Sequence, residues 1–343
     1  MKKVLFIRAD GNEKIGIGHV MRSMTIAAEF RRNGYECIYL SSDPAPTEIL
    51  KKNGYDLIPI AYGYEEKSKE EAEEICRLVR ERGADYILVD SYFAGNDYLS
   101  VLRTAAKVIV VSSVKQFLDT DYLINENIAV DREYLSGLYS GSGAKLLLGS
   151  EYSMIREEFV CREYSVAETV RTVLVTTGGG DYYNFMGGFL RRIKERKDLE
   201  NIRFTFIVGN VNPHYPELLE ESEHLENVTI IRNADNMSEL MMGSDLAISA
   251  GGTTVLELAV IGVPTMAISV ADDQKAGLSF MHDEGMLLYA GDIRDDSFWD
   301  RVILYFDELM TDPVKRKSIS AKAGESVDGF GIKRIYQQIT GDK

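Results

Sequence analysis

Short runs of hydrophobic residues alternate along the chain with stretches in which hydrophobic residues recur every three or four positions. The short runs are typical of buried strands, and the second pattern is typical of helices with one buried face. Their alternation predicts βαβ units on parallel sheets. The strands predicted in the first half are Val4–Arg8, Cys37–Leu40, Leu57–Ile60, Tyr86–Asp90, Val108–Ser112, Tyr122–Asn125 and Leu146–Leu148. The helices predicted there are Val20–Arg32, Thr47–Asn53 and the charge-rich Glu65–Arg82, whose charges we expect to face solvent.

The pattern restarts at Thr172. It predicts strands at Thr172–Thr177, Phe204–Val208, Val228–Ile231, Leu246–Ala250 and Thr265–Val270, and helices at Phe185–Lys194, Met237–Met242, Thr253–Ile261 and Ile332–Ile339. Two successive halves of this kind predict an α/β protein with two Rossmann-like, doubly wound domains. We expect an N-terminal domain at residues 1–160 and a C-terminal domain at 161–343, and the last helix is a candidate to pack back on the N-terminal domain.

The bulk composition narrows the function classes. The 343 residues are enough for two cores, and 45% hydrophobic residues is an ordinary globular share. The formal net charge of −15 repels nucleic-acid backbones and anionic membrane surfaces. We therefore expect no nucleic-acid partner, and an anionic small ligand would need local donors such as helix N-termini.

Cysteine usage and hydropathy predict a cytoplasmic protein. The cysteines, Cys37, Cys76 and Cys161, include no CxxC pair, so the sequence supports neither a disulfide framework nor a cysteine zinc site. The apolar run at the N-terminus stops before Arg8, which is too short for a signal peptide. The longest uncharged stretch, Leu258–Ala271, contains Gly and Pro and is too short for a membrane helix, so we expect no membrane insertion.

The loop after the first predicted strand carries candidate catalytic residues. His19 falls in the first turn of the next helix, where the helix dipole disfavours the imidazolium form. A neutral imidazole can accept a proton from water, and Asp10 on the same loop could orient the ring or a sugar hydroxyl. The alternative is that His19 only caps the helix and Asp10 only shapes the loop. Gly16 and Gly18 suggest a dinucleotide fingerprint, but the third glycine is missing at Met21, and the chain has no P-loop.

The segment Ser249-Ala250-Gly251-Gly252-Thr253-Thr254-Val255-Leu256-Glu257 is a candidate nucleotide site. A strand ends in two glycines, two hydroxyl residues open a helix, and free N–H groups at that N-terminus suit a diphosphate. Glu257 follows one turn after Thr253, and a carboxylate there can accept the hydroxyls of a ribose. The alternative is that Thr253 caps the helix and Glu257 lies in solvent.

Two weaker features occupy the same sheet edge. Gly178-Gly179-Gly180-Asp181 follows the first strand of the second half, and Asp272-Asp273-Gln274 follows a later one. Two adjacent aspartates without further ligands are poor evidence for a metal site. His214, His224 and His282 lack a partner pattern, and we interpret them as surface or core residues.

The loop RADGNEKIGIGHVMR closely resembles the opening of the UDP-sugar hydrolases of pseudaminic acid biosynthesis and of the related spore-coat polysaccharide proteins called SpsG. Both belong to the GT-B-like superfamily, which includes the MurG glycosyltransferase. The resemblance spans nearly the whole chain. Further matches are Val89-Asp90-Ser91-Tyr92, Leu148-Gly149-Ser150-Glu151-Tyr152, Arg156-Glu157-Glu158-Phe159, Thr177-Gly178-Gly179-Gly180-Asp181, the segment Ser249–Glu257 and Val327-Asp328-Gly329.

The resemblance implies a GT-B fold with the active site in a cleft between the domains, no metal and no cofactor. It implies that His19 is the base that activates water for inverting attack on the anomeric carbon of a UDP-sugar, with Asp10 beside it. The substrate-binding residues it implies are Arg8, Gly16, Gly18, Arg22, Asp90, Tyr92 and Gln274. The nucleotide-binding residues it implies are Gly178, Gly179, Gly180, Ser249, Gly251, Gly252, Thr253, Thr254 and Glu257.

The sequence departs from the family at two places. Ser112-Ser113-Val114 replaces a paired-aspartate segment, and Asp273 replaces a common asparagine. Because of these changes, the sequence does not determine the identity of the sugar or of the nucleotide base. It does not determine the oligomeric state either. The first hypothesis is hydrolysis of a nucleotide-linked amino or deoxy sugar in bacterial surface-glycan synthesis. The second is a GT-B glycosyltransferase with the same donor site, and the third is a non-catalytic nucleotide-sugar binding protein.

Overall fold

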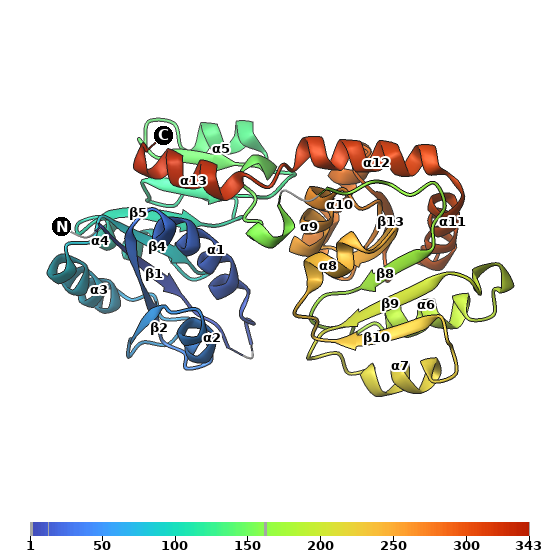
Figure 1. The fold of residues 1–343 in the computed structure, drawn as a ribbon. Helices are drawn as coiled ribbons and strands as arrows, with labels where there is room; N and C mark the ends of the chain where they lie inside the picture. The colour runs from blue at the N-terminus through green and yellow to red at the C-terminus, as the bar shows by residue number, and fades with distance from the viewer. Residues whose placement is uncertain (1–2, 13, 161–162, 343) are drawn as a thin grey trace. The chain divides into compact units, whose positions relative to one another are not determined.

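The computed structural model describes residues 3–12, 14–160 and 163–342, and it divides the chain into two compact units. Unit 1 comprises Met1–Met154 and Phe330–Lys343, and unit 2 comprises Ile155–Gly329. Each unit is a parallel sheet flanked by helices (Figure 1), so the predicted α/β doubly wound class is confirmed. Unit 2 begins a few residues before the predicted domain boundary, and the chain returns to unit 1 for its last helix.

The sheet of unit 1 has seven strands in the order β3-β2-β1-β4-β5-β6-β7. The strands are β1 Lys3–Ala9, β2 Tyr35–Ser41, β3 Asp56–Pro59, β4 Tyr86–Asp90, β5 Lys107–Val111, β6 Tyr122–Asn125 and β7 Lys145–Leu148. The helices are α1 Gly18–Arg32, α2 Thr47–Lys52, α3 Lys69–Arg82, α4 Asn96–Leu102, α5 Arg132–Leu138 and α13 Gly331–Thr340. All seven strands were predicted, whereas α4 and α5 were not.

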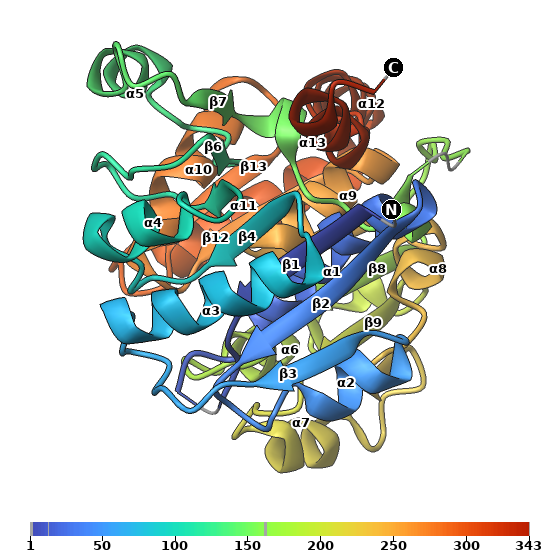
Figure 2. The ribbon, with the colours of Figure 1, turned by 90° about the vertical axis from the view of Figure 1, so that its left-hand side faces the viewer.

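Successive side chains of each strand point to opposite faces of this sheet, as the two-residue period of a strand requires. Leu5 and Ile7 of β1 pack with α1 and α13 on one face, and Val4 and Phe6 pack with α3 and α4 on the other. Figure 2 shows α3 and α4 in front of the strands of unit 1. The predicted helix Glu65–Arg82 begins only at Lys69, because the Ser68 side chain accepts a hydrogen bond from the backbone N–H of Glu71 and caps the helix.

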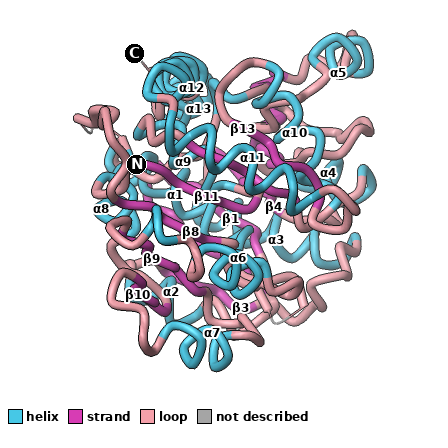
Figure 3. The backbone as a smooth tube through the Cα atoms, turned by 90° about the vertical axis from the view of Figure 1, so that its right-hand side faces the viewer, coloured by secondary structure: helices cyan, strands magenta, loops and turns pink. Residues whose placement is uncertain are grey.

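The sheet of unit 2 has six strands in the order β10-β9-β8-β11-β12-β13. The strands are β8 Thr172–Thr176, β9 Arg203–Val208, β10 Val228–Arg232, β11 Leu246–Ala250, β12 Thr265–Ser269 and β13 Leu288–Asp292. The helices are α6 Phe185–Ile193, α7 Tyr215–Ser222, α8 Met237–Met242, α9 Thr253–Ile261, α10 Asp272–Asp283, α11 Phe298–Thr311 and α12 Pro313–Ser326. Figure 3 shows α6 and α11 in front of this sheet. Five of these elements, β13, α7, α10, α11 and α12, were not predicted from the sequence.

Both sheets reverse their strand order at the same place in their topology. In unit 1 the reversal lies between β1 and β4, and in unit 2 it lies between β8 and β11. Loops that leave the carboxyl ends of such strands in opposite directions open a crevice, which is the usual ligand site of an open α/β sheet. The His19 loop follows β1, and the two glycine-rich loops follow β8 and β11, so each unit brings its predicted site residues to its own crevice.

Helix α13 completes the core of unit 1. Ile335 is fully buried there, and the Tyr336 ring meets the Phe30 ring of α1 edge to face, with 5.1 Å between centroids. The hydroxyl groups of Tyr86 and Tyr122 donate to the Ile339 carbonyl at 3.2 and 3.0 Å. The C-terminal end of the chain is therefore part of the first fold unit.

We predict that Ile335→Ala destabilises unit 1 by about 2–4 kcal/mol, because it opens a cavity between α13 and α1. The chain's single tryptophan, Trp299, lies in unit 2, so its fluorescence reports the wrong unit. Hydrogen exchange should instead show faster exchange in α1 and β1 and little change in β8. Gln337→Ala, on the exposed side of the same helix, is the matched control. Equal exchange in the two variants would contradict the prediction.

Candidate functional site

The candidate site of unit 1 is a hydrogen-bonded group of His19, Asp90 and Arg22. Asp90 ends β4 and is fully buried, and its Oδ1 lies 2.5 Å from Nδ1 of His19. Arg22, three residues after His19 on α1, donates Nε–H and Nη2–H to the two oxygens of the same carboxylate at 2.6 Å each. Because β1 pairs with β4, the start of α1 lies beside the end of β4, which brings these side chains together.

The charge state of Asp90 determines the orientation of His19. Burial tends to raise the pKa of Asp90, but the charge of Arg22 and the hydrogen bonds from Arg22 and His19 outweigh burial, so this pKa lies below its ordinary value. The resulting carboxylate can only accept hydrogen bonds, so it takes the Nδ1–H of His19. Nε2 then carries the lone pair and is the nitrogen that can accept a proton.

His19 lines a small cavity with Asp10 and Ile15 of its own loop and with two further chain segments, namely Tyr64 and the run Asp90, Ser91, Tyr92 and Phe93. The Tyr92 ring meets the His19 ring edge to face at a centroid distance of 4.5 Å. Tyr92 and Phe93 are 66% and 42% exposed, and Ile17 nearby in the sequence is 42% exposed. Exposed aromatic side chains beside a buried histidine provide an apolar surface on which a sugar ring could lie.

Asp10 has different partners from those that its position in the loop suggested. Its carboxylate lies 2.5 Å from Nη1 of Arg8, accepts the backbone N–H of Ser42 at 3.0 Å and accepts from Nζ of Lys67 at 3.2 Å. Burial tends to raise the pKa of Asp10, but Arg8 and Lys67 outweigh it and lower this pKa. The structure thus gives the contact that orients His19 to Asp90 instead of Asp10.

Arg8 is fully buried and holds the Asp10 carboxylate in place through their ion pair. Its Nε–H donates to Oε1 of Glu71 at 2.7 Å, and the hydroxyl of Tyr98 donates to the same oxygen at 2.8 Å. The expectation that the charges of this helix face solvent is wrong for Glu71, which is fully buried. The available signal was its spacing from Ile75, one helical turn away on the apolar face. Sequence reasoning also missed Lys67.

The two glycines of the first loop shape its end. Gly16 has a φ of 68°, and its carbonyl accepts the N–H of Asn12 at 3.2 Å, which closes a small loop before α1. Gly18 is the first residue of α1. In unit 1 the structure therefore brings together Asp10, His19, Arg22, Asp90 and Tyr92 at one crevice, whereas Arg8 lies beneath it.

A second candidate site lies in unit 2, where β11 passes into α9. Gly252 is the N-cap of α9 with a φ of 138°, which side chains rarely allow. A Cβ at Gly251 would lie 2.8 Å from Cβ of Gln274, so only glycine fits there. Thr253 and Thr254 open the helix without acting as its N-cap, and Glu257 is buried. Both parts of the alternative interpretation, a Thr253 cap and a solvated Glu257, are therefore wrong.

Ser249 and Gln274 support this loop from within. The Ser249 hydroxyl is buried and donates to the Ala250 carbonyl at 2.9 Å. The Gln274 side chain donates to the Gly251 carbonyl at 2.8 Å and accepts the Val270 N–H at 2.8 Å. Gln274 thereby joins the loop after β12 to the loop after β11. Its predicted contact with a sugar or phosphate stays a prediction.

The glycine run after β8 forms the neighbouring loop. Gly178 has a φ of 79°, and the carboxylate of Asp181 accepts the first two N–H groups of α6, those of Phe185 and Met186, at 2.8 Å each. Gly209 at the end of β9 was missed by the sequence analysis. A Cβ at Gly209 would overlap the carbonyl oxygens of Gly178 and Gly179, so the loops after β8 and β9 pack backbone to backbone.

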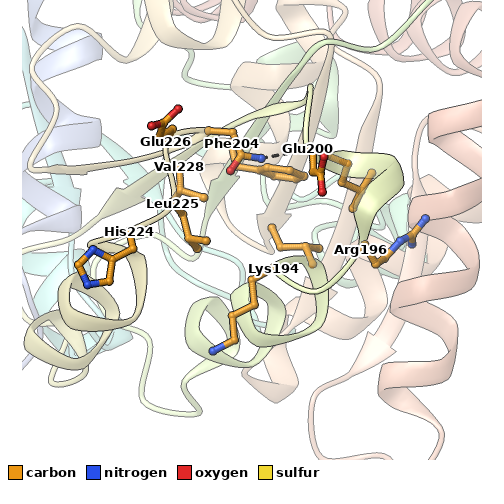
Figure 4. Close-up of a pocket in the computed structure, with 11 residues that line it drawn as sticks. Lys194, Arg196, Glu200, Phe204, His224, Leu225, Glu226 and Val228 are labelled. Atoms are coloured by element: carbon orange, nitrogen blue, oxygen red, sulfur yellow. Dashed lines mark hydrogen bonds between the residues drawn. The ribbon is translucent and has the colours of Figure 1, made fainter.

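A separate pocket in unit 2 lies at the opposite edge of the sheet. Figure 4 shows it near the starts of β9 and β10, around Phe204 and Val228, with Lys194, Arg196 and His224 also lining it. Lys194 pairs with Glu221, and Arg196 pairs with Asp198 and Asp307. Since this pocket lies away from the carboxyl ends of the strands, we do not assign it to the candidate site.

Within the described residues, no group of three or more His, Cys, Asp or Glu side chains is arranged to hold a metal ion. Cys37 and Cys76 are buried free thiols, and Cys161 lies outside the described residues. In the described part of the chain, every helix is too short or too polar to cross a membrane.

Comparisons with known proteins agree with this architecture. Residues 172–286 match the glycosyltransferase family 28 C-terminal domain. The spore coat polysaccharide biosynthesis protein SpsG of Bacillus subtilis is 24% identical over 96% of this chain and 95% of its own length. The UDP-2,4-diacetamido-2,4,6-trideoxy-beta-L-altropyranose hydrolase of Campylobacter jejuni is 22% identical over 82% of this chain and 97% of its own.

The crystal structure of MurG from Acinetobacter baumannii superposes with a TM-score of 0.69 at 13% identity, over 99% of this chain and 100% of that one. This similarity confirms the predicted GT-B fold. The resemblance that the sequence motifs suggested is confirmed by the two curated relatives, which match over most of the chain. The chain is a GT-B protein similar to SpsG and to the UDP-sugar hydrolase of Campylobacter jejuni.

Proposed function

We propose that this protein is an enzyme that hydrolyses a nucleotide-linked amino or deoxy sugar, most simply a UDP-sugar, in bacterial surface-polysaccharide synthesis. The observation that carries the proposal is the hydrogen-bonded group of His19, Asp90 and Arg22 beside a small cavity lined by exposed aromatic rings. The name of the Campylobacter jejuni relative supports the substrate class, and SpsG supports the pathway. The buried free thiols Cys37 and Cys76 suit a reducing cytoplasm.

In the proposed reaction, Asp90 holds the Nδ1–H of His19, and Nε2 accepts a proton from water as the water oxygen attacks the anomeric carbon. The bond between that carbon and the diphosphate oxygen breaks, and its electron pair leaves with the nucleoside diphosphate. The products are the free sugar with inverted configuration, the nucleoside diphosphate and a proton, which His19 passes to solvent. Asp10, held by Arg8 and Lys67, is available to accept a sugar hydroxyl.

In unit 2 we assign the diphosphate to the N–H groups at the start of α9 and to the glycine loop Gly178–Gly180. The N-terminus of α9 carries partial positive charge, and Gly252, beside which a Cβ would meet open space, allows a ligand to approach the backbone closely. Glu257 would accept the ribose hydroxyls. The proposed mechanism needs no metal ion, because the helix N-terminus and water activation by His19 supply the required stabilisation.

The second candidate function is glycosyl transfer, with an acceptor hydroxyl in place of water. The match to the glycosyltransferase family 28 C-terminal domain and the similarity to MurG favour it. The same histidine could deprotonate an acceptor. The net charge of −15 argues against a membrane-bound acceptor, because it repels anionic lipid surfaces.

We predict that His19→Ala lowers kcat about 10²- to 10⁴-fold, since the general base is lost, and leaves UDP affinity nearly unchanged. Turnover of a UDP-sugar and calorimetric titration with UDP measure the two effects. His224→Ala, at the rim of the remote pocket, is the matched control and should retain full activity. Normal turnover in the His19 variant would refute its role as the base.

We predict that Asp90→Asn lowers kcat about 10²-fold, because an amide can donate to Nδ1 and stabilise the wrong tautomer of His19. In a His19→Ala background the same change should cost nothing further, since its effect passes through the histidine. Asp97→Asn on the exposed start of α4 is the control. Additive losses in the double variant would show that Asp90 acts independently of His19.

We predict that UDP stabilises the protein in a thermal-shift screen against UDP, GDP, CDP, CMP and ADP, by about 2.7 kcal/mol at about 100 times its Kd. A response to GDP or a cytidine nucleotide alone would move the substrate to another nucleotide. No response to any of them would overturn the nucleotide-sugar assignment. Turnover in ¹⁸O-water should then place the label on the released sugar, and much faster transfer to an added acceptor would favour the transferase.

A further inference from the structure

Arg156 and the residues after it form a motif that the proposed chemistry leaves without a role. Arg156 precedes the short 3₁₀ helix η2 Glu157–Phe159, and η2 packs against α9. Within unit 2 the Arg156 guanidinium has three contacts. Nη1 lies 2.6 Å from Oε1 of Glu158, Nη2 donates to Oε1 of Glu257 at 3.2 Å, and the carbon of the guanidinium lies 4.7 Å from the centroid of the buried Phe159 ring.

The Arg156 contact offsets the cost of burying the carboxylate of Glu257 on α9. Glu257 is only 8% exposed, on a helix whose other side chains are mostly apolar. Burial raises the pKa of Glu257, Arg156 acts against this rise, and the nearby Glu158 adds to it. Arg156 is therefore the cation that favours the carboxylate form of Glu257. The paired Glu158 is held in turn by the Ser238 hydroxyl at 3.5 Å.

We propose that Arg156 is a positioning residue of the nucleotide site, which orients the Glu257 carboxylate to accept the ribose hydroxyls of a nucleoside diphosphate. The geometry supports this role, because the contact involves one carboxylate oxygen, Oε1, and the other can face a ligand. The Arg156 side chain is 42% exposed, so it can adjust when a ligand arrives. A carboxylate accepts hydroxyl hydrogen bonds more strongly than a neutral acid does. This inference rests on the proposed nucleotide site.

The test compares UDP with 2′,3′-dideoxyuridine 5′-diphosphate, which lacks both ribose hydroxyls. Calorimetry on the full chain measures the preference for UDP across about pH 6 to about pH 9 in the wild type and in Arg156→Gln. Without Arg156, Glu257 stays protonated to higher pH, so the preference should fall about tenfold near the acidic end and return as the pH rises. The affinity for the dideoxy nucleotide should change little.

The controls separate positioning from a general loss of structure. Arg191→Gln removes a similarly exposed arginine that pairs with Glu221 on the same unit, and it should leave the preference intact. Glu257→Gln should abolish the preference at every pH, and adding Arg156→Gln to it should change nothing more. Arg156→Lys keeps the charge and should retain part of the preference for UDP. It replaces Arg156→Gln as the test variant if the glutamine variant does not fold.

An unchanged preference for UDP in Arg156→Gln at every pH would overturn the inference and leave the proposed function intact. Wild-type binding of UDP without any preference over the dideoxy nucleotide would also overturn it, because Glu257 would then not contact the ribose. If the wild type bound neither nucleotide, the proposed function itself would fail, and the inference with it.

Discussion

The parallel pairing of β1 with β4 is the constraint on which the candidate catalytic group depends. In this register Ala9 lies opposite Asp90, so the loop after β1 and the end of β4 meet at one edge of the sheet. A shift of one residue would turn Asp90 to the other face of the sheet. Arg22 lies on the same face of α1 as His19, because three residues are close to one helical turn. The reversal of strand order between β1 and β4 therefore brings residues that are distant in the sequence into one hydrogen-bonded group.

Unit 1 holds its buried carboxylates in place with arginines. Asp90 is paired with Arg22, and Asp10 is paired with the fully buried Arg8, which also binds Glu71. Removing one partner from such a pair leaves an uncompensated buried charge, so these pairs strongly favour one arrangement of the crevice. Unit 2 uses its backbone instead. The N-terminus of α9 leaves its first N–H groups without partners inside the helix, and Gln274 donates to the Gly251 carbonyl in the loop before it. Side chains suit proton transfer, whereas backbone donors suit a diphosphate.

The sequence by itself determined the α/β class, nearly all strands and the two most distinctive loops. Buried parallel strands are continuous apolar runs, and glycine-rich turns between a strand and a helix need no tertiary information to be recognised. β13 was missed because Leu288–Asp292 contains a glycine and ends in an aspartate, which blurs the apolar run. Polar residues interrupt the apolar stripes of α10 and α12, whereas α11 has a regular stripe, Phe298, Val302, Phe306 and Leu309, that was overlooked. The motif resemblance pointed to Asp90 and Tyr92 but did not say what they contact.

Only the tertiary structure decided which charged groups meet. His19 and Asp90 are 71 positions apart, and Arg156 and Glu257 are 101 apart, so no local pattern links them. Asp10 lies close to His19 in sequence and seemed its natural partner, yet strand pairing and the buried Arg8 direct it elsewhere. The burial of Glu71 and Glu257 likewise depends on which helices cover which sheet face. The type of a residue determines which interactions its side chain can make. The fold determines its partners, because contacts between distant residues follow from strand order rather than from sequence spacing.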